Sequence, residues 1–171
     1  MSQVRTGMIP LITEGEIKEM VTDLAREIER DYEGREITMI CPLKGSVAFF
    51  ADLVRRIQLP QVIDFVHVTS PRGEGCRIIK DISIDIRGKH VLIIEEIIDA
   101  GRTLSFLKTR LLASEPKSLK VVALLDKPAR RELPIRPDYV GTTIDDRFVI
   151  GYGMDSDEFG RNYKDIYNFA Q

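Results

Sequence analysis

The stretch that begins with the apolar run Val91–Ile94 constrains this chain more than any other feature of its sequence. Four consecutive aliphatic residues of this kind are typical of a strand that is buried on both faces of a parallel sheet. The run leads into Glu95-Glu96-Ile97-Ile98 and then into Asp99-Ala100-Gly101-Arg102-Thr103, after which the pattern becomes helical. The sequence therefore predicts a buried strand, an acidic pair where that strand surfaces, and a short glycine-containing loop before a helix.

Apolar strands and amphipathic helices alternate along the rest of the chain. A capping box at Thr13 and Glu16 predicts a helix that ends near 32–34, and further helices are expected over 47–57 and 104–112. Strands are expected over 37–41, where Pro42 ends the strand, and over 62–68, 91–94 and 120–125, with 76–80 returning antiparallel. Short strands around 139–144 and 148–152 precede a polar tail. This order predicts one α/β domain over 1–171, with a mostly parallel central sheet flanked by helices.

Composition narrows the class of protein. The 171 residues are 43% hydrophobic and 30% charged, with a formal net charge of -2 and no basic run, which argues against a nucleic-acid partner. No apolar stretch approaches the roughly 18 residues of a membrane span, and the N-terminus lacks the pattern of a signal peptide. Two cysteines are too few for a disulfide scaffold, so a cytoplasmic location is expected.

The loop Asp99–Thr103 has two interpretations. Backbone N–H groups before a helix can hold a phosphate, and Gly101 leaves room for its approach. The alternative is a simple helix cap made by Asp99 or Thr103. The adjacent Glu95 and Glu96 favour the phosphate site, because two carboxylates at the end of a buried strand are costly to desolvate without partners.

Several segments, in the right order, resemble the type I phosphoribosyltransferases and, more closely, the hypoxanthine-guanine phosphoribosyltransferases. Glu95–Thr103 resembles their phosphoribosyl-diphosphate-binding signature, and Arg161 lies at the expected distance near the end of the chain. The other similar segments are Pro42–Ser46, Phe49–Val54, Gly88–Ile94, Leu124–Pro128, Asp138–Gly141 and Phe148–Asp155. The resemblance implies the type I phosphoribosyltransferase fold, with a small hood built from the chain ends.

The resemblance also implies a role for each matching residue. Phosphate would bind at Asp99, Ala100, Gly101, Arg102 and Thr103, and diphosphate at Lys44, Gly45 and Arg161. Glu95 and Glu96 would accept hydrogen bonds from the ribose hydroxyls and, with Asp155, hold Mg²⁺. Asp99 would be the catalytic acid near purine N7.

The purine would be held by Lys127 at O6, by stacking on Phe148, by the backbone of Val149 and by Asp155. Taken alone, Lys44 could be a surface lysine, Phe148 a core residue and Asp155 a surface acid. We expect the phosphate loop, the acidic pair and the Lys127 site to open into one cavity.

Three departures from the family pattern concern the same site. Glu96 stands where aspartate is usual, and Ala100 stands where serine or threonine normally offers a hydroxyl to the phosphate. The covering loop over 69–77 is short, and Ser70 is followed by Pro71 rather than tyrosine.

The function expected from the resemblance is Mg²⁺-dependent purine salvage. A 5-phosphoribosyl group would pass from phosphoribosyl diphosphate to N9 of hypoxanthine or guanine, giving IMP or GMP and diphosphate. A homo-oligomer, either a dimer or a tetramer, is expected as well. The three departures leave one alternative, a catalytically weak regulator on the same fold that senses nucleotide or phosphoribosyl diphosphate.

Overall fold

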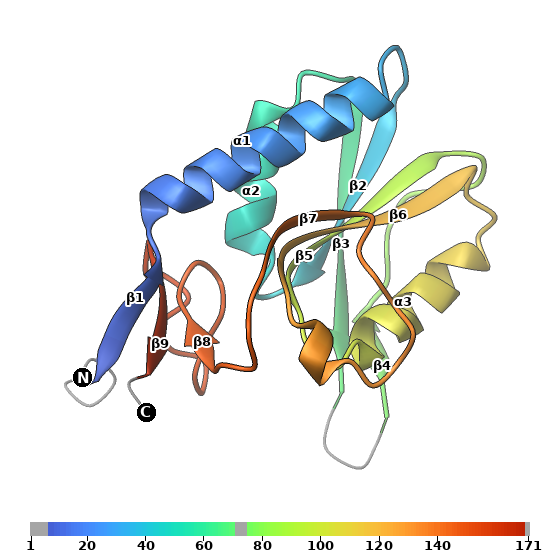
Figure 1. The fold of residues 1–171 in the computed structure, drawn as a ribbon. Coiled ribbons are helices and arrows are strands. Elements are labelled where there is room, and N and C mark those ends of the chain that lie inside the picture. The colour runs from blue at the N-terminus through green and yellow to red at the C-terminus, as the bar shows by residue number, and fades with distance from the viewer. Residues whose placement is uncertain (1–6, 71–74, 170–171) are drawn as a thin grey trace.

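The computed structural model describes residues 7–70 and 75–169, in which a six-stranded sheet forms the centre. The strand order is β4-β3-β2-β5-β6-β7. Its members are β2 (Ile37–Leu43), β3 (Gln61–Thr69), β4 (Arg77–Lys80), β5 (His90–Ile98), β6 (Ser118–Asp126) and β7 (Tyr139–Thr143). All neighbours pair in parallel except β4, which returns antiparallel to β3 as predicted. The mostly parallel sheet is therefore confirmed (Figure 1).

Helices cover both faces of this sheet (Figure 1). They are α1 (Glu14–Asp31), α2 (Val47–Arg56), α3 (Arg102–Leu112) and the short 3-10 helix η1 (Pro128–Arg130). The predicted capping box opens α1: the Glu16 N–H donates to Thr13 Oγ1 at 3.3 Å, and the Thr13 N–H donates to Glu16 Oε2 at 2.8 Å. The three predicted helices are thus confirmed within a few residues at their ends.

Alternate residues of the central strands supply two separate cores. On one face Met39, Leu92, Ile94 and Leu124 pack with apolar side chains of α1 and α2. On the other face Ile40, Val91, Ile93 and Ala123 pack with Leu104, Leu107 and Leu111 of α3. Because both faces are covered, the central strands are apolar at consecutive positions, which is why Val91–Ile94 is an unbroken aliphatic run.

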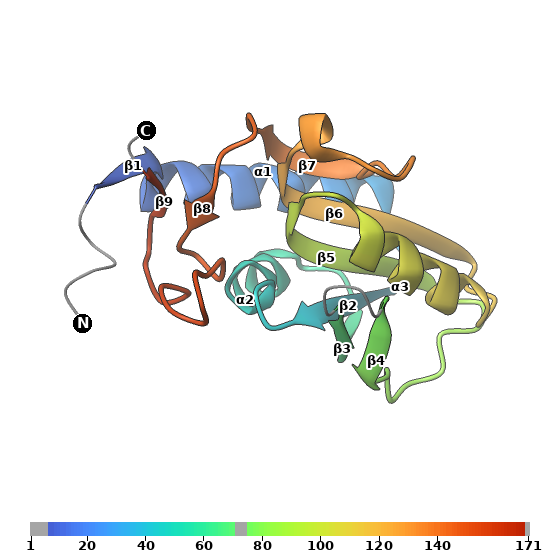
Figure 2. The same cartoon turned by 90° about the horizontal axis from the view of Figure 1, so that it is seen from below.

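A second, three-stranded sheet lies beyond α2, at one end of the molecule (Figure 2). It has the order β1-β9-β8, with β1 (Met8–Ile12), β9 (Ile166–Phe169) and β8 (Val149–Ile150). The hood formed from the chain ends is therefore confirmed. The prediction of a polar tail is wrong, because Ile166 is fully buried and β9 pairs with both other strands.

Two strands continue two residues or more past the C-terminal ends predicted for them. Pro42 does not end β2, because the pairing with β5 stops at Ile40 while the pairing with β3 continues to Leu43. Proline is tolerated where a strand is paired on one side only. In the second case, β5 runs to Ile98, past the acidic pair, because Glu95 and Ile97 continue the parallel pairing with β6.

The connections of the sheet create the place where a ligand can bind. From β2 the chain passes through α2 to β3 on one side, whereas from β5 it passes through α3 to β6 on the other side. Neighbouring connections that leave in opposite directions open a crevice at the carboxyl ends of their strands. This crevice lies between β2 and β5. Within the described residues, no helix is long and apolar enough to cross a membrane.

Candidate active site

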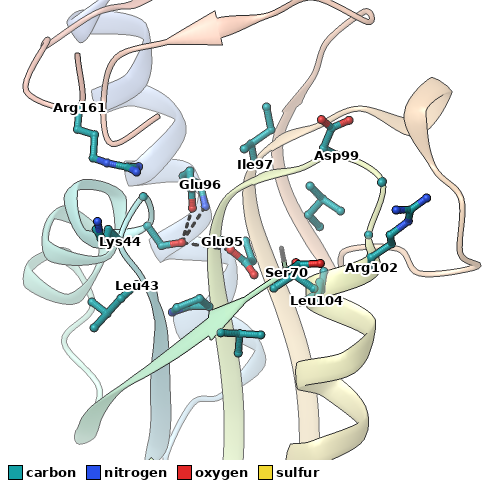
Figure 3. A pocket seen from close by; sticks show the side chains of 18 residues that line it. Leu43, Lys44, Ser70, Glu95, Glu96, Ile97, Asp99, Arg102, Leu104 and Arg161 are labelled. Carbon is teal, nitrogen blue, oxygen red and sulfur yellow. Dashed lines mark hydrogen bonds between the residues drawn. The ribbon is translucent and has the colours of Figure 1, made fainter. Parts of the chain in front are cut away.

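A cleft of about 410 Å³ lies at the carboxyl ends of β2 and β5. The loop after β2 contributes Lys44, Gly45 and Ser46, and β5 contributes the acidic pair. The loop before α3 and the hood residue Arg161 complete the wall (Figure 3). Segments that are far apart in the sequence therefore meet where the strand connections diverge.

Ser46 joins the two acids of the pair. Its hydroxyl lies 3.2 Å from Glu95 Oε2, makes a short contact with Glu96 Oε2, and accepts the Glu96 N–H at 3.4 Å. Ser46 is 1% exposed and occupies the N-cap position of α2, yet its side chain makes no capping hydrogen bond. The hydroxyl is thus used to orient the carboxylates. Sequence reasoning missed this role, because Ser46 resembles an ordinary cap residue before a helix.

The buried environment of Glu95 and Glu96 disfavours ionisation of both carboxyl groups when no ligand offsets their charge. Burial, followed by the charge of Glu96, raises the pKa of Glu95 well above its ordinary value. Burial also raises the pKa of Glu96. Groups that donate hydrogen bonds or carry positive charge would stabilise the ionised pair. Sugar hydroxyls and a divalent cation are ligands of this kind.

Gly45 is required for the position of Glu96. A Cβ atom at residue 45 would lie 1.9 Å from Glu96 Oε1, far inside any normal contact. The hood also approaches this loop closely, since a Cβ atom at Gly153, where φ is +98°, would lie 1.9 Å from the Gly45 oxygen. Glycine at both positions lets the acidic pair and the hood meet the loop after β2.

The loop 99–103 is not a side-chain helix cap. Helix α3 begins at Arg102, and its N-cap is Gly101 with φ 84° and no capping side chain. The alternative that Asp99 or Thr103 simply caps the helix is therefore wrong. The first N–H groups of α3 have no acceptor within the helix and border the cleft, together with Ala100 and Thr103. This arrangement suits a phosphate.

The turn after β6 holds this loop in place. Arg130 Nε donates to the side-chain oxygen Oδ1 of Asp99 at 3.0 Å, and Arg131 Nη1 donates to the backbone carbonyl oxygen of Asp99 at 2.7 Å. The Glu132 N–H donates to the Ala100 oxygen at 3.1 Å, and the side chain of Glu132 forms a short ion pair with Arg102. No role was predicted for Arg130 and Arg131 from the sequence. The signal that could have found them is the charged stretch that follows Lys127.

The two cations expected to bind diphosphate come together at the cleft. Lys44 follows β2, and Arg161 reaches in from the hood, where its Nη1 donates to the Gly153 oxygen at 2.8 Å. Both form ion pairs with Glu158, and Arg161 also pairs with Asp155 at 2.9 Å. Hydrogen bonds from Lys44 and then from Arg161 lower the pKa of Glu158. Lys44 is therefore not an isolated surface lysine.

None of the expected purine residues is among those that line the cleft, although Lys127 and Asp155 each contact a residue that does. The Lys127 N–H donates to the oxygen of the cleft residue Ile98 at 3.0 Å. Lys127 is only 6% exposed, but its ammonium group has no hydrogen-bond or ion-pair partner among the described residues. The ammonium is not one of the buried side-chain atoms that lack a partner in the described residues, so it reaches the surface, where a ligand could accept its hydrogen bond.

The ring of Phe148 is 57% exposed and lies 5.8 Å from that of Phe169. The alternative of a core phenylalanine is therefore wrong. Val149 is buried in β8. Asp155 is partly buried and held by Arg161, so it is not a free surface acid. Glu95 and Thr103 share one cleft as expected, whereas the inclusion of Lys127 in the same cavity stays a prediction.

The donor set suits Mg²⁺ only in part. Within residues 7–70 and 75–169, no group of three or more acids, histidines or cysteines is close enough to hold a metal ion. Glu95, Glu96 and Asp155 thus do not form a three-ligand cage. The carboxylates of Glu95 and Glu96 nevertheless fit Mg²⁺, because this ion keeps several waters and uses one or two carboxylates together with substrate phosphates.

The covering loop is described only at its ends. Ser70 lines the cleft, and β4 starts at Arg77. Pro71 and the rest of 71–74 lie outside the described residues, so the expectation of a short lid stays a prediction.

Comparisons with known proteins agree with this geometry. Residues 12–157 match the family model described as Phosphoribosyl transferase domain. The chain is 45% identical over 153 residues to the hypoxanthine phosphoribosyltransferase of Salmonella typhimurium, with 85% of each chain covered. It is 44% identical over 158 residues to the bifunctional protein TilS/HprT of Listeria innocua, but spans only 24% of that protein's length.

A solved structure shows the same likeness. A hypoxanthine-guanine phosphoribosyltransferase from Bacillus anthracis matches with a TM-score of 0.92 and 43% identity, over 95% of this chain and 98% of that chain. The family match, the identities and the shared fold show that this chain belongs to the phosphoribosyl transferase family and has the type I phosphoribosyltransferase fold.

Proposed function

We propose that this protein is a purine-salvage enzyme. It transfers the 5-phosphoribosyl group of phosphoribosyl diphosphate to N9 of hypoxanthine or guanine, and forms IMP or GMP and diphosphate. The observation that carries this proposal is the Glu95–Glu96 pair, oriented by Ser46 and placed beside the free N-terminus of α3. The names of the relatives from Salmonella typhimurium and Bacillus anthracis support the reaction class.

The sugar phosphate spans the cleft between β2 and β5. Its 5-phosphate binds the loop from Asp99 to Thr103, where backbone N–H groups and the Thr103 hydroxyl donate to it. Its ribose hydroxyls donate to Glu95 and Glu96, whose raised pKa values indicate carboxylates in need of such partners.

The leaving group lies at the hood side of the cleft. Lys44 and Arg161 contact the diphosphate. Because Gly45 has no side chain, the backbone N–H groups of this loop can approach the diphosphate closely. Glu95 and Glu96, together with Asp155, would hold Mg²⁺, which when bound would supply positive charge to neutralise the diphosphate. As the glycosidic bond forms between N9 and the sugar carbon, the bond to diphosphate breaks.

A different set of residues positions the purine base. Lys127 donates to O6, Phe148 offers an exposed ring for stacking, the backbone of Val149 reads the purine edge, and Asp155 lies near the 2-position. Asp99 receives or returns the proton at N7 while N9 attacks. Its hydrogen bond with Arg130 fixes the carboxylate before the base arrives.

Three further features belong to the proposal. A single domain over 1–171 and a cytoplasmic location are expected from the sequence pattern and composition, and a homo-oligomer (dimer or tetramer) is expected from the resemblance. The alternative of a sensing regulator loses support, because the matched relatives from Salmonella typhimurium and Bacillus anthracis are named as transferases.

A product assay tests the proposal. The protein is incubated with phosphoribosyl diphosphate, Mg²⁺ and one free base at a time, and nucleotide is measured by chromatography. We expect nucleotide from hypoxanthine or guanine and none from adenine. Saturable binding of phosphoribosyl diphosphate without nucleotide from any base would instead support the regulator.

A further inference from the structure

A single oxygen atom holds both cations of the proposed diphosphate site. Glu158 Oε2 lies 3.0 Å from Lys44 Nζ and 3.2 Å from Arg161 Nη2. Lys44 follows β2 whereas Arg161 belongs to the hood, so this carboxylate bridges the two parts of the cleft. An anion therefore already sits between the two groups that are expected to bind an anionic ligand.

The backbone at Glu158 has a left-handed conformation that residues other than glycine rarely adopt. Glu158 and Asp157 have φ values of 69° and 50°, and the Phe159 N–H donates to the Ser156 oxygen at 3.0 Å. Such a two-residue turn with left-handed backbone favours glycine, above all at its second central position. Nearby Gly151, Gly153 and Gly160 fill other left-handed positions. Glutamate is uncommon at such a position, and of the two central residues only Glu158 has an ion pair with Lys44 or Arg161.

The bridge is also easy to displace. The side chains of Glu158 and Lys44 are 62% and 55% exposed, and Arg161 keeps Asp155 as a second partner at 2.9 Å. Ion pairs between exposed groups are weak and are screened by salt. A diphosphate carries more negative charge and more oxygen atoms than one carboxylate, so it can replace Glu158 at both cations.

We propose that Glu158 occupies the diphosphate position in the ligand-free protein, where it holds Lys44 and Arg161 together and competes with diphosphate. The proposal rests on the proposed function, which assigns these two cations to diphosphate. Glu158 is thus a positioning residue that lowers the affinity for diphosphate and eases its release.

Calorimetry with inorganic diphosphate in the presence of Mg²⁺ tests the competition. Glu158→Gln keeps the size of the side chain and removes its charge. We expect diphosphate to bind about two- to tenfold more tightly, the range for two weak exposed ion pairs, with the gain shrinking as salt is added. Asp157→Asn is the matched control, because it removes a charge from the same turn and makes no ion pair with Lys44 or Arg161. The affinity of the Asp157→Asn variant for diphosphate should stay at the wild-type value.

The other outcomes separate this inference from the proposed function. If Glu158→Gln binds diphosphate like the wild type, or more weakly, while Lys44→Ala loses binding, the competition is refuted and the diphosphate site stands. An equal gain in Asp157→Asn would also refute it, because any loss of negative charge would then suffice. If neither the wild type nor Glu158→Gln binds diphosphate, the proposed function loses its leaving-group site and this inference fails with it.

Discussion

The close approach of Gly45 to Glu96 allows a quantitative prediction for Gly45→Ala. The added Cβ atom would lie 1.9 Å from Glu96 Oε1 and 2.6 Å from Cδ, whereas ordinary contact begins at 3.4 Å. The carboxylate would have to retreat by about 1.5 Å, the difference between these two distances, and would leave its contact with Ser46. A misplacement of about 1 Å in a catalytic site costs roughly 100-fold in rate.

The expected result is a roughly 100-fold lower kcat/KM for phosphoribosyl diphosphate, equal to about 2.7 kcal/mol of transition-state stabilisation. Crowding at the loop should also lower the free energy of unfolding by about 1–3 kcal/mol. Steady-state rates of nucleotide formation and thermal unfolding measure the two effects separately. Gly15→Ala is the matched control: the nearest atom to its new Cβ would be Thr13 Oγ1 at 3.9 Å, so activity should not change.

A second substitution tests the cause. Glu96→Asp shortens the acid by one carbon–carbon bond, about 1.5 Å, and so makes room for a Cβ atom at residue 45. The double variant Gly45→Ala/Glu96→Asp should therefore be more active than Gly45→Ala alone, a coupling expected between residues in contact. Wild-type kcat/KM in Gly45→Ala, or equal activity of the single and double variants, would refute the reasoning.

Three further substitutions test individual assignments by steady-state kinetics and calorimetry. Asp99→Asn should lower kcat by about 100-fold or more with little change in KM, as expected for loss of a general acid–base group; an unchanged rate would remove Asp99 from the mechanism. Lys127→Ala should lower kcat/KM for hypoxanthine by about tenfold or more, because a charged hydrogen bond is lost, and an unaltered efficiency would refute the contact with O6. Ala100→Ser should tighten binding of phosphoribosyl diphosphate by about tenfold, from the hydroxyl that it adds; equal affinity in calorimetry would mean that the backbone already saturates the phosphate.

The sequence predicted those parts of the fold that depend on local pattern and on burial. The aliphatic run Val91–Ile94 identified a central strand because both faces of β5 are covered by helices. Thr13 and Glu16 marked the start of α1 through hydrogen bonds between near neighbours. The acidic pair lies at a cleft, and its cost of burial could be judged from the sequence; that the cleft binds a ligand stays a prediction.

Features that depend on contacts between distant segments could not be predicted. Strand β9 is short and follows a polar segment, and its pairing with β1 and β8 makes it a strand. The contacts of Ser46 with Glu95 and Glu96 depend on the fold, which brings the start of α2 to β5. The bridge from Glu158 to Lys44 joins positions more than one hundred residues apart. No local signal in the sequence reports such a pair.

A crystal structure with phosphoribosyl diphosphate and Mg²⁺ bound would test the proposed site most directly. We expect the 5-phosphate at Asp99–Thr103, the ribose hydroxyls on Glu95 and Glu96, and the diphosphate at Lys44 and Arg161. A second groove offers a competing place for the ligand, since it is lined by Lys18, Arg55, Arg56 and Lys164 and also reaches Arg161. Phosphoribosyl diphosphate bound in that groove, with no sugar at the acidic pair, would contradict the central claim.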